Sequence, residues 1–247
     1  MTPETLSAVM EATWPPARAL PGPGFVLRDG AGGGKRVSAA TALPDWTIAD
    51  LTGAESGMRA TGQDPLFLIR NGDQMLDDAL QARGYAVVDP VMAYAIAANA
   101  LPASPWMTTF PHWPPMAVAR EIWAMGGISG PRLDVMDRVT APKTALLARA
   151  VDRAAGVAFV ALHGQTAMLH ALEVSPLHRR QGSAQNLISA AAAWTISAGG
   201  STLSLVVTTA NTAARGVYEK CGMQVVGQYH YRALPAAKAQ RRLIEPA

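Results

Sequence analysis

A turn rich in glycine and arginine has the residue types of an anion site. The run Val174-Ser-Pro-Leu-His-Arg179-Arg180-Gln-Gly182-Ser-Ala lies between a predicted strand and a predicted helix. A glycine here lets a ligand approach the backbone, and the N–H groups of the first helical turn lack intrahelical partners and carry the positive end of the helix dipole. Arg179 and Arg180 add forked cationic donors. The run therefore predicts a pyrophosphate site, although a surface turn with two solvated arginines fits it equally well.

A second run, later in the chain, contains a tyrosine whose hydroxyl could take part in chemistry. In Asn211-Thr-Ala-Ala-Arg-Gly-Val-Tyr218-Glu-Lys-Cys-Gly222-Met, an asparagine follows a predicted strand and Gly222 is typical of a helix end. Tyr218 lies on the helix between them. Its phenol could supply a proton in catalysis, or its ring could pack in the core of an amphipathic helix.

Together the two runs resemble the signatures of the GNAT superfamily of N-acetyltransferases. The first signature is arginine or glutamine, two residues, glycine, one residue, then glycine or alanine, which Arg179, Gly182 and Ala184 match. The asparagine, tyrosine and glycine of the second run match the second hallmark in the expected order. The resemblance covers about Val118–Leu234. Two positions depart from the pattern, Ser183 where an aliphatic residue is usual and Met223 where phenylalanine is common.

This resemblance implies an enzyme that moves an acetyl group from acetyl-CoA to a primary amine, by direct attack in a ternary complex and without a metal. The cofactor-binding residues that it implies are Leu172, Val174, Arg179, Arg180, Gln181, Gly182, Ser183, Ala184 and Asn211. The rival interpretation is a non-catalytic acyl-CoA-binding or scaffold protein built on a duplicated GNAT fold.

Three residues are candidates for proton transfer. Tyr218 matches the family's acid for the departing thiolate, and the backbone N–H of Val174 is the expected oxyanion donor. His170 is the first candidate for the base, because a histidine titrates near neutrality, but a packed structural histidine is equally consistent with its position. Strand alternation puts His170, Leu172 and Val174 on one face and Glu173 on the other. A bulge, which this strand often has in the family, would bring Glu173 round as an alternative base; water is a third.

The pattern of the C-terminal half predicts an α/β fold with a mixed sheet of the GNAT type. The expected helices are Ala117–Met125, Leu133–Val139, Gly182–Ser197 and Thr212–Lys220. The expected strands are Thr144–Val151, Val157–His163, Thr166–Val174, Thr202–Thr208 and Met223–Arg232.

The N-terminal half contains a weaker copy of the closing strand–helix–strand portion, at Pro65–Arg70, Asp73–Arg83 and Tyr85–Ile96. Setting Gly84 on Gly222 aligns the two at an offset of 138 residues, with Leu80 in place of Tyr218. We therefore expect a tandem arrangement with an inactive N-terminal copy over 1–100. Five prolines predict a linker over 101–115, which leaves a catalytic domain over 116–247.

The glycines Gly32-Gly33-Gly34 lack the other residues of a phosphate loop, and we interpret them as a hairpin turn between extended runs at Phe25–Arg28 and Arg36–Ala42. The acceptor pocket is expected around Trp123–Ile128 and Gln228–Arg232.

The composition of the chain excludes some classes of binding partner. A net charge of +3 without a basic patch argues against nucleic acid, and the apolar runs are too short to span a membrane. The start of the chain does not have the pattern of a signal peptide, and the single Cys221 fits a reducing cytoplasm. The expected acceptor is an amino acid, another small amine or a protein N-terminus. The sequence does not indicate the oligomeric state.

Overall fold

The computed structural model describes residues 1–235, so the last twelve residues of the predicted catalytic domain lie outside the described part. The helices are α1 (Pro3–Thr13), α2 (Lys35–Ser38), α3 (Ile48–Ala60), α4 (Gln74–Ala82), α5 (Ala117–Met125), α6 (Gly130–Arg138), α7 (Ser183–Ser197) and α8 (Thr212–Lys220), with 3-10 turns η1 (Ala98–Ala100) and η2 (Pro176–His178). The strands are β1 (Arg18–Gly22), β2 (Phe25–Asp29), β3 (Thr41–Ala42), β4 (Leu66–Arg70), β5 (Ala86–Ala97), β6 (Thr109–His112), β7 (Lys143–Ala150), β8 (Arg153–His163), β9 (Thr166–Val174), β10 (Thr202–Thr208) and β11 (Gln224–Ala233). Within this part of the chain, none of the helices combines the length and hydrophobicity that a membrane span requires.

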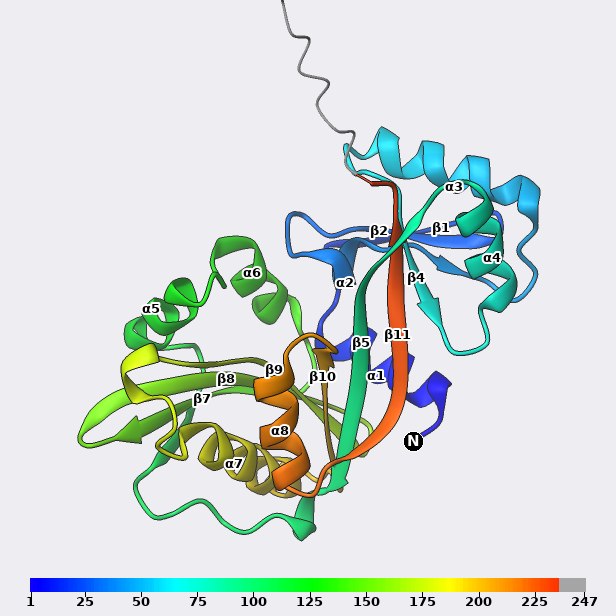
Figure 1. Ribbon diagram of the computed structural model, residues 1–247. Helices are drawn as coiled ribbons and strands as arrows, with labels where there is room; N and C mark the ends of the chain where they lie inside the picture. The colour runs from blue at the N-terminus through cyan, green and yellow to red at the C-terminus, as the bar shows by residue number, and fades with distance from the viewer. Residues whose placement is uncertain (236–247) are drawn as a thin grey trace, which may run out of the picture.

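The strands form one large mixed sheet and one small antiparallel sheet (Figure 1). The large sheet has the order β4-β11-β5-β10-β9-β8-β7-β6, and its β9–β10 pair is parallel. The small sheet, β1-β2-β3, touches the large one through a parallel bridge between Ala40 and Phe67. The predicted α/β class with a mixed sheet is confirmed.

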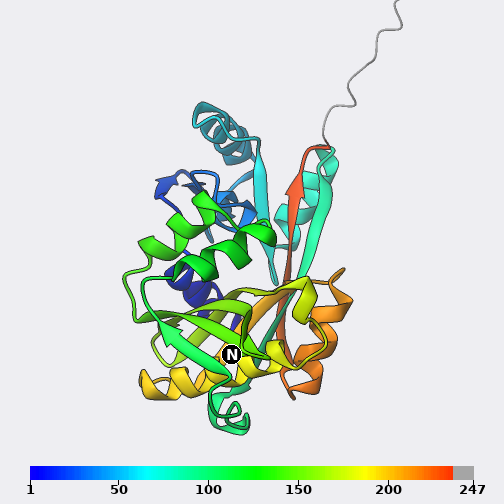
Figure 2. The ribbon, with the colours of Figure 1, turned by 90° about the vertical axis from the view of Figure 1, so that its left-hand side faces the viewer.

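Helices cover both faces of the large sheet (Figure 2). On one face, α7 packs on β7 to β10, and the core beneath α7 and α8 includes Leu169, Leu187 and Tyr218. On the other face, α1 and α5 pack on β8 and β9 over a core that includes Trp14, Trp123 and Phe159. The parallel pair β9–β10 therefore runs between two apolar layers.

The two halves of the chain exchange strands. β5 comes from the N-terminal half but lies between β10 and β11 of the C-terminal half, and β11 lies between β4 and β5. Both central strands are antiparallel to their neighbours on either side. The predicted boundary near residue 100 therefore does not separate two independent sheets.

The predicted linker over 101–115 contains a strand that the sequence analysis missed. Thr109–His112 forms β6, which pairs with β7 at the edge of the large sheet. Proline at 111 is compatible with this strand because an edge strand has one side free of ladder hydrogen bonds.

The internal copy has a physical counterpart. Adding 138 to the residue numbers of α4 gives those of α8, and the β-pair Gln224–Ala95 maps onto the pair Ala233–Ala86. Side-chain contacts map as well. Arg232 Nη2 donates to Gln81 Oε1 at 3.1 Å, and at the equivalent positions the hydroxyl of Tyr94 donates to Glu219 Oε1 at 3.1 Å. The offset predicted from sequence therefore relates elements that make the same contacts.

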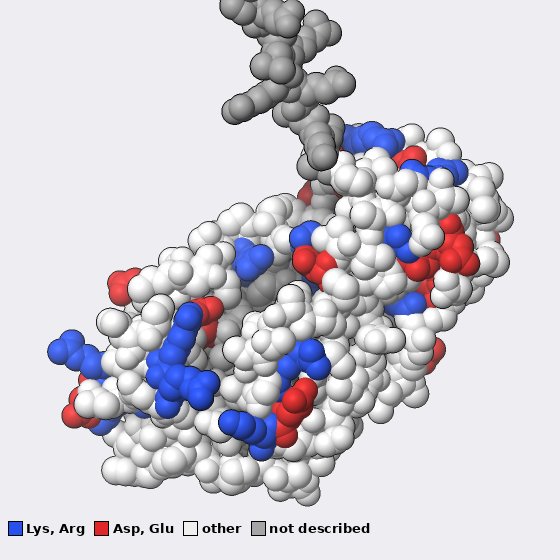
Figure 3. Space-filling view, viewed as in Figure 1, with Lys and Arg blue, Asp and Glu red and all other residues white. Residues whose placement is uncertain are grey.

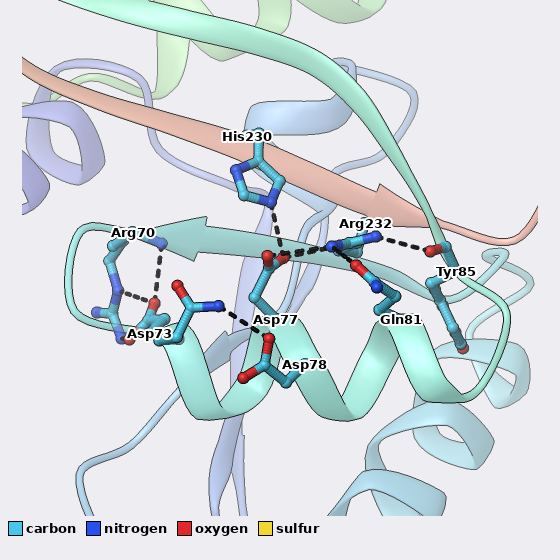
Figure 4. Close-up of polar contacts among 9 residues, drawn as sticks. Arg70, Asp73, Asp77, Asp78, Gln81, Tyr85, His230 and Arg232 are labelled. Carbon is cyan, nitrogen blue, oxygen red and sulfur yellow. Dashed lines mark hydrogen bonds and ion pairs between the residues drawn. The ribbon is translucent and has the colours of Figure 1, made fainter.

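A polar cluster fixes β11 against α4 (Figure 4). Asp77 on α4 accepts from Arg232 Nε at 2.7 Å, from Arg232 Nη2 at 3.0 Å and from His230 Nε2 at 2.8 Å. Arg232 also donates to the carbonyl of Tyr85, and only 5% of its surface is exposed. The hydrogen bonds from Arg232 lower the pKa of Asp77, so the carboxylate is charged at neutral pH.

Candidate active site

The parallel strands β9 and β10 separate halfway along their length. Their pairing runs from Thr166–Thr202 to Leu169–Leu205 and stops, although β9 continues to Val174 and β10 to Thr208. β10 stays paired with β5 over this stretch. The edge of β9 that faces β10 is therefore open from 170 onward.

A bulge in β9 shapes this opening. On β8, Val157 pairs with Glu173 and Phe159 with His170, so Ala171 and Leu172 together oppose one residue. Ala171 has a positive φ of 50°, and its carbonyl accepts a hydrogen bond from Trp123 Nε1 at 2.7 Å. This two-to-one arrangement is a β-bulge.

The bulge corrects the predicted alternation of side chains. Leu172 packs with Leu169 on the face covered by α7 and α8. Glu173 and His170 both face the α5 side, where the carboxylate of Glu173 lies against Gly126 and His170 stacks on Trp14. His170 and Leu172 are thus on opposite faces, and the bulge has brought Glu173 round.

The backbone of Val174 faces the opening. Ser175 N–H donates to the carbonyl of Ala155 on the β8 side at 2.9 Å. Because neighbouring residues in an antiparallel ladder alternate in direction, the N–H of Val174 points away from β8 and toward the gap. The open edge therefore offers a free donor at the position predicted for the oxyanion.

The start of α7 lies at the foot of the opening. Gly182 is its N-cap in the left-handed conformation, with φ of 83°, and the first helical bond is made by Asn186 N–H. The N–H groups of residues 183–185 precede that bond and have no intrahelical partner. Ser183 is buried, and its Oγ lacks a hydrogen-bond partner among residues 1–235.

The two predicted arginines of this turn differ in their contacts. Arg179 Nε donates to the carbonyl of Val174 at 3.2 Å, and its Nη2 lies 3.4 Å from Glu173 Oε1. Arg180, like Gln181, is exposed. These residues fit an anionic group such as a pyrophosphate, because free N–H donors, an orphaned hydroxyl and exposed cations meet at one helix start.

Tyr218 lies across the opening, on α8. It is 8% exposed, its ring centroid is 5.8 Å from that of Tyr94, and it lines the same cavity as Leu172 and Leu205. Burial is the main cause that raises the pKa of Tyr218 to about 12, so the phenol is protonated at neutral pH. Asn211 caps α8, since its side chain accepts from Ala214 N–H at 3.1 Å.

The opening leads into a cavity of about 360 Å³. Residues on and next to β9, β10 and α8 line it, including Leu172, Leu205, Asn211 and Tyr218, together with Trp14, Gly33, Gly34, Lys35, Arg36 and Asp89 of the N-terminal half, Arg132 of α6 and Tyr229 and Tyr231 of β11. Figure 3 shows a hollow in this face of the molecule with Lys and Arg side chains at its rim. The cavity therefore passes from one face of the sheet to the other.

His170 lines this cavity but is held on both ring nitrogens. Thr13 Oγ1 donates to the carbonyl of Val9 at 2.6 Å, so Nε2 of His170 is assigned as donor to Thr13 Oγ1 at 2.9 Å. The remaining nitrogen, Nδ1, then accepts from Arg36 Nη1 at 3.0 Å. Burial, and next the charge of Arg36, lower the pKa of His170 well below its usual value. This arrangement argues against the predicted role as base, since protonation would break the bond to Arg36 and set two cations side by side.

Of the three predicted catalytic residues, the structure brings Tyr218 and His170 to one cavity but not Glu173. The carboxylate of Glu173 contacts Gly126 and Arg179 and does not line the cavity.

The sequence analysis missed the contribution of the N-terminal half. The extended run expected at Arg36–Ala42 is wrong, because Lys35–Ser38 forms α2 and only Thr41–Ala42 is strand. Gly34, with φ of 99°, precedes this helical turn, which carries Arg36 to His170. Gly33 and Gly34 form part of the cavity wall and are not a solvated hairpin.

Comparison with known proteins agrees with this geometry. Residues 113–223 match the model of the Acetyltransferase (GNAT) family. The fold is similar to that of a GCN5-related N-acetyltransferase from Kribbella flavida, with a TM-score of 0.73 and 15% identity over 94% of this chain and 95% of that one. It is also similar to a conserved protein of unknown function from Staphylococcus epidermidis (TM-score 0.67, 13% identity, 90% and 96% of the two chains) and to a tandem GNAT protein from the clavulanic acid biosynthesis pathway (0.60, 14%, 94% and 88%). No curated protein matches the sequence. Residues 113–223 thus form an acetyltransferase domain of the GNAT family.

Proposed function

We propose that the protein is an acetyl-CoA-dependent N-acetyltransferase that acts on a primary amine by direct attack in a ternary complex. The observation that carries this proposal is the separation of β9 and β10 beyond Leu169 and Leu205, with unpaired N–H groups at the start of α7 on one side of it and the protonated phenol of Tyr218 on α8.

The residues of the opening divide the work. The N–H groups at the start of α7, with Arg179 and Arg180, would hold the pyrophosphate of the cofactor, and the open edge of β9 would bind its extended arm. The N–H of Val174 would donate to the thioester oxygen as that oxygen gains charge. Bound acetyl-CoA supplies the activated acyl group.

In the proposed step the amine nitrogen bonds to the acyl carbon as the carbon–sulfur bond breaks, and the hydroxyl of Tyr218 protonates the departing sulfur. The proton lost by the amine passes to water in the cavity and returns the phenol to its starting state. Water is preferred as the base because both nitrogens of His170 are occupied and Glu173 lies outside the cavity.

The N-terminal copy is proposed to be inactive. Leu80 occupies the position equivalent to Tyr218, is fully buried and cannot donate a proton. In its place, this half of the chain contributes the far wall of the cavity through Trp14, Lys35 and Arg36.

Two measurements test the proposal. Calorimetry should detect binding of acetyl-CoA, and thiol release should follow when a pooled panel of primary amines is added. A protein that binds acetyl-CoA but transfers its acetyl group to no amine would be the acyl-CoA-binding scaffold instead. A protein that does not bind acetyl-CoA would contradict both interpretations.

A further inference from the structure

The far wall of the cavity concentrates positive charge. Lys35, Arg36, Arg132 and Asp89 line it, which amounts to a formal charge of +2. None of them belongs to the turn at the start of α7 that is proposed to hold the pyrophosphate. Their charge is therefore separate from the cations of that turn and available to the acceptor.

Asp89 does not neutralise all of these cations. Its carboxylate accepts from Lys35 Nζ at 2.7 Å, so that pair cancels itself. Within residues 1–235, Arg36 and Arg132 form no salt bridge. Two guanidinium groups thus line the cavity without a carboxylate of their own.

The guanidinium of Arg36 is fixed by a neighbouring side chain. Its Nη1 donates to the neutral His170, which is in turn fixed by Thr13 and stacked on Trp14. Its Nε is buried and lacks a partner in the described chain. Arg36 also lines the cavity, where a ligand carboxylate would meet a cation that no carboxylate of the described chain neutralises.

Arg132 lies beside the same turn. A methyl group on Gly34 would stand 3.7 Å from both Nε and Nη2 of Arg132, so this guanidinium rests against the backbone that leads into Arg36. Guanidinium forks match the two oxygens of a carboxylate, which a single ammonium does not. The cavity of about 360 Å³ is of a size that small ligands occupy.

We propose that the acceptor is a small amine that also carries a carboxylate, such as a free amino acid, and that Arg36 and Arg132 bind this carboxylate. This inference rests on the proposed function. In this arrangement the carboxylate anchors the acceptor at Arg36 and Arg132 while its amino group faces the opening between β9 and β10. Arg36 on α2 and Arg132 on α6 then determine which amine is used.

The experiment compares amino acids with their own carboxamides. Thiol release from acetyl-CoA is measured for the common L-amino acids, β-alanine and the corresponding amides, with the full chain. Loss of charge-assisted hydrogen bonds typically weakens binding about 10- to 150-fold, so at least one acid should exceed its amide by that factor in kcat/KM. Arg36→Gln and Arg132→Gln should each raise the KM for that acid. The KM for the corresponding amide and the Kd of acetyl-CoA should stay unchanged.

Arg153→Gln is the matched control, because Arg153 is exposed at the start of β8 and does not line the cavity. If Arg36→Gln proves unstable, the exposed Arg132→Gln carries the test. Equal or better use of the amides would overturn the inference and leave the proposed function standing. Weakened acetyl-CoA binding in both arginine variants would assign these cations to the cofactor and also overturn it. Acetyl-CoA binding without turnover of any acid would do the same, whereas loss of acetyl-CoA binding in the native protein would refute the proposed function itself.

Discussion

Replacing Tyr218 with phenylalanine isolates the hydroxyl that we assign to the departing thiolate. The ring stays in the core beneath α7 and α8, where it is 8% exposed and contacts Tyr94. We therefore expect unchanged binding of acetyl-CoA and a change in the free energy of unfolding within about 1 kcal/mol, as for the loss of one hydroxyl without a strong partner. Turnover alone should fall.

The size of that fall follows from the pKa of the acid. Burial raises the pKa of Tyr218 to about 12, whereas a free thiol has a pKa of about 8.5. Proton transfer from Tyr218 to a fully solvated thiolate would therefore be uphill by about 3.5 pKa units, or about 4.8 kcal/mol. Burial also raises the pKa of a thiol, as it does for the neighbouring Cys221, and narrows this gap. Because the acid remains a weak one, we expect a decrease of about 100-fold, at the lower end of the range for a lost general acid.

The assay is thiol release under saturating acetyl-CoA, from pH 6 to 10, with the best amine of the panel. Since the pKa of Tyr218 is raised, its protonated form persists through this range, and the wild type should show no loss of turnover up to about pH 10. Tyr85→Phe serves as control, because it removes a buried hydroxyl bonded to Glu55 far from the cavity. A Tyr218→Phe enzyme within threefold of the wild type, or a falling limb near pH 8 in the native enzyme, would refute the assignment.

Three further outcomes are expected. Gly182→Asp should abolish the thermal stabilisation by acetyl-CoA, which is about 2.7 kcal/mol at a hundredfold excess over Kd, whereas Gly199→Asp, with a similar φ of 88° at the other end of α7, should retain it. Asp77→Asn should lower the free energy of unfolding by about 3 kcal/mol, measured in urea at pH 7. The pKa of Asp77 is lowered in the fold, so the stability that its carboxylate contributes is present above about pH 4 and disappears as the pH falls further. The native and variant proteins should therefore have the same stability in acid. Trp123→Phe removes the donor to the carbonyl of Ala171 and should destabilise the protein by about 1–3 kcal/mol while raising the KM for acetyl-CoA; an unchanged KM would show that the bulge does not need this bond.

The elements of the family domain could be predicted from local pattern. Thr166–Val174, Thr202–Thr208 and Thr212–Lys220 begin and end where the alternation and helical spacing indicate. Each is amphipathic or apolar enough for its own sequence to determine its type. The positions of Gly182 at the start of α7 and of Tyr218 on α8 could be predicted because both lie in short runs at such elements, whereas their roles stay predictions.

Features that depend on distant partners could not be predicted. The positive φ of Ala171 is stabilised by Trp123, which lies far away in sequence, and the occupied nitrogens of His170 depend on Thr13 and Arg36. Nothing in the local pattern around His170 distinguishes a base from an imidazole held by two partners. The cavity wall was missed for the same reason, because Lys35 and Arg36 lie in the half that lacks the family motifs and Arg132 lies outside both motif runs.

The strand exchange has a consequence for how the chain acquires its structure. Val91 in β5 pairs with Tyr229 in β11, 138 residues further along. Contacts of such sequence separation form late, because the loop-closure entropy must be overcome before they stabilise anything. On a ribosome the N-terminal half emerges before β11, which pairs with both β4 and β5, so each of these strands presents an unpaired edge until β11 is made. Neither half can therefore complete its sheet during synthesis of the other, and the chain matures as one cooperative unit only once β11 has been translated.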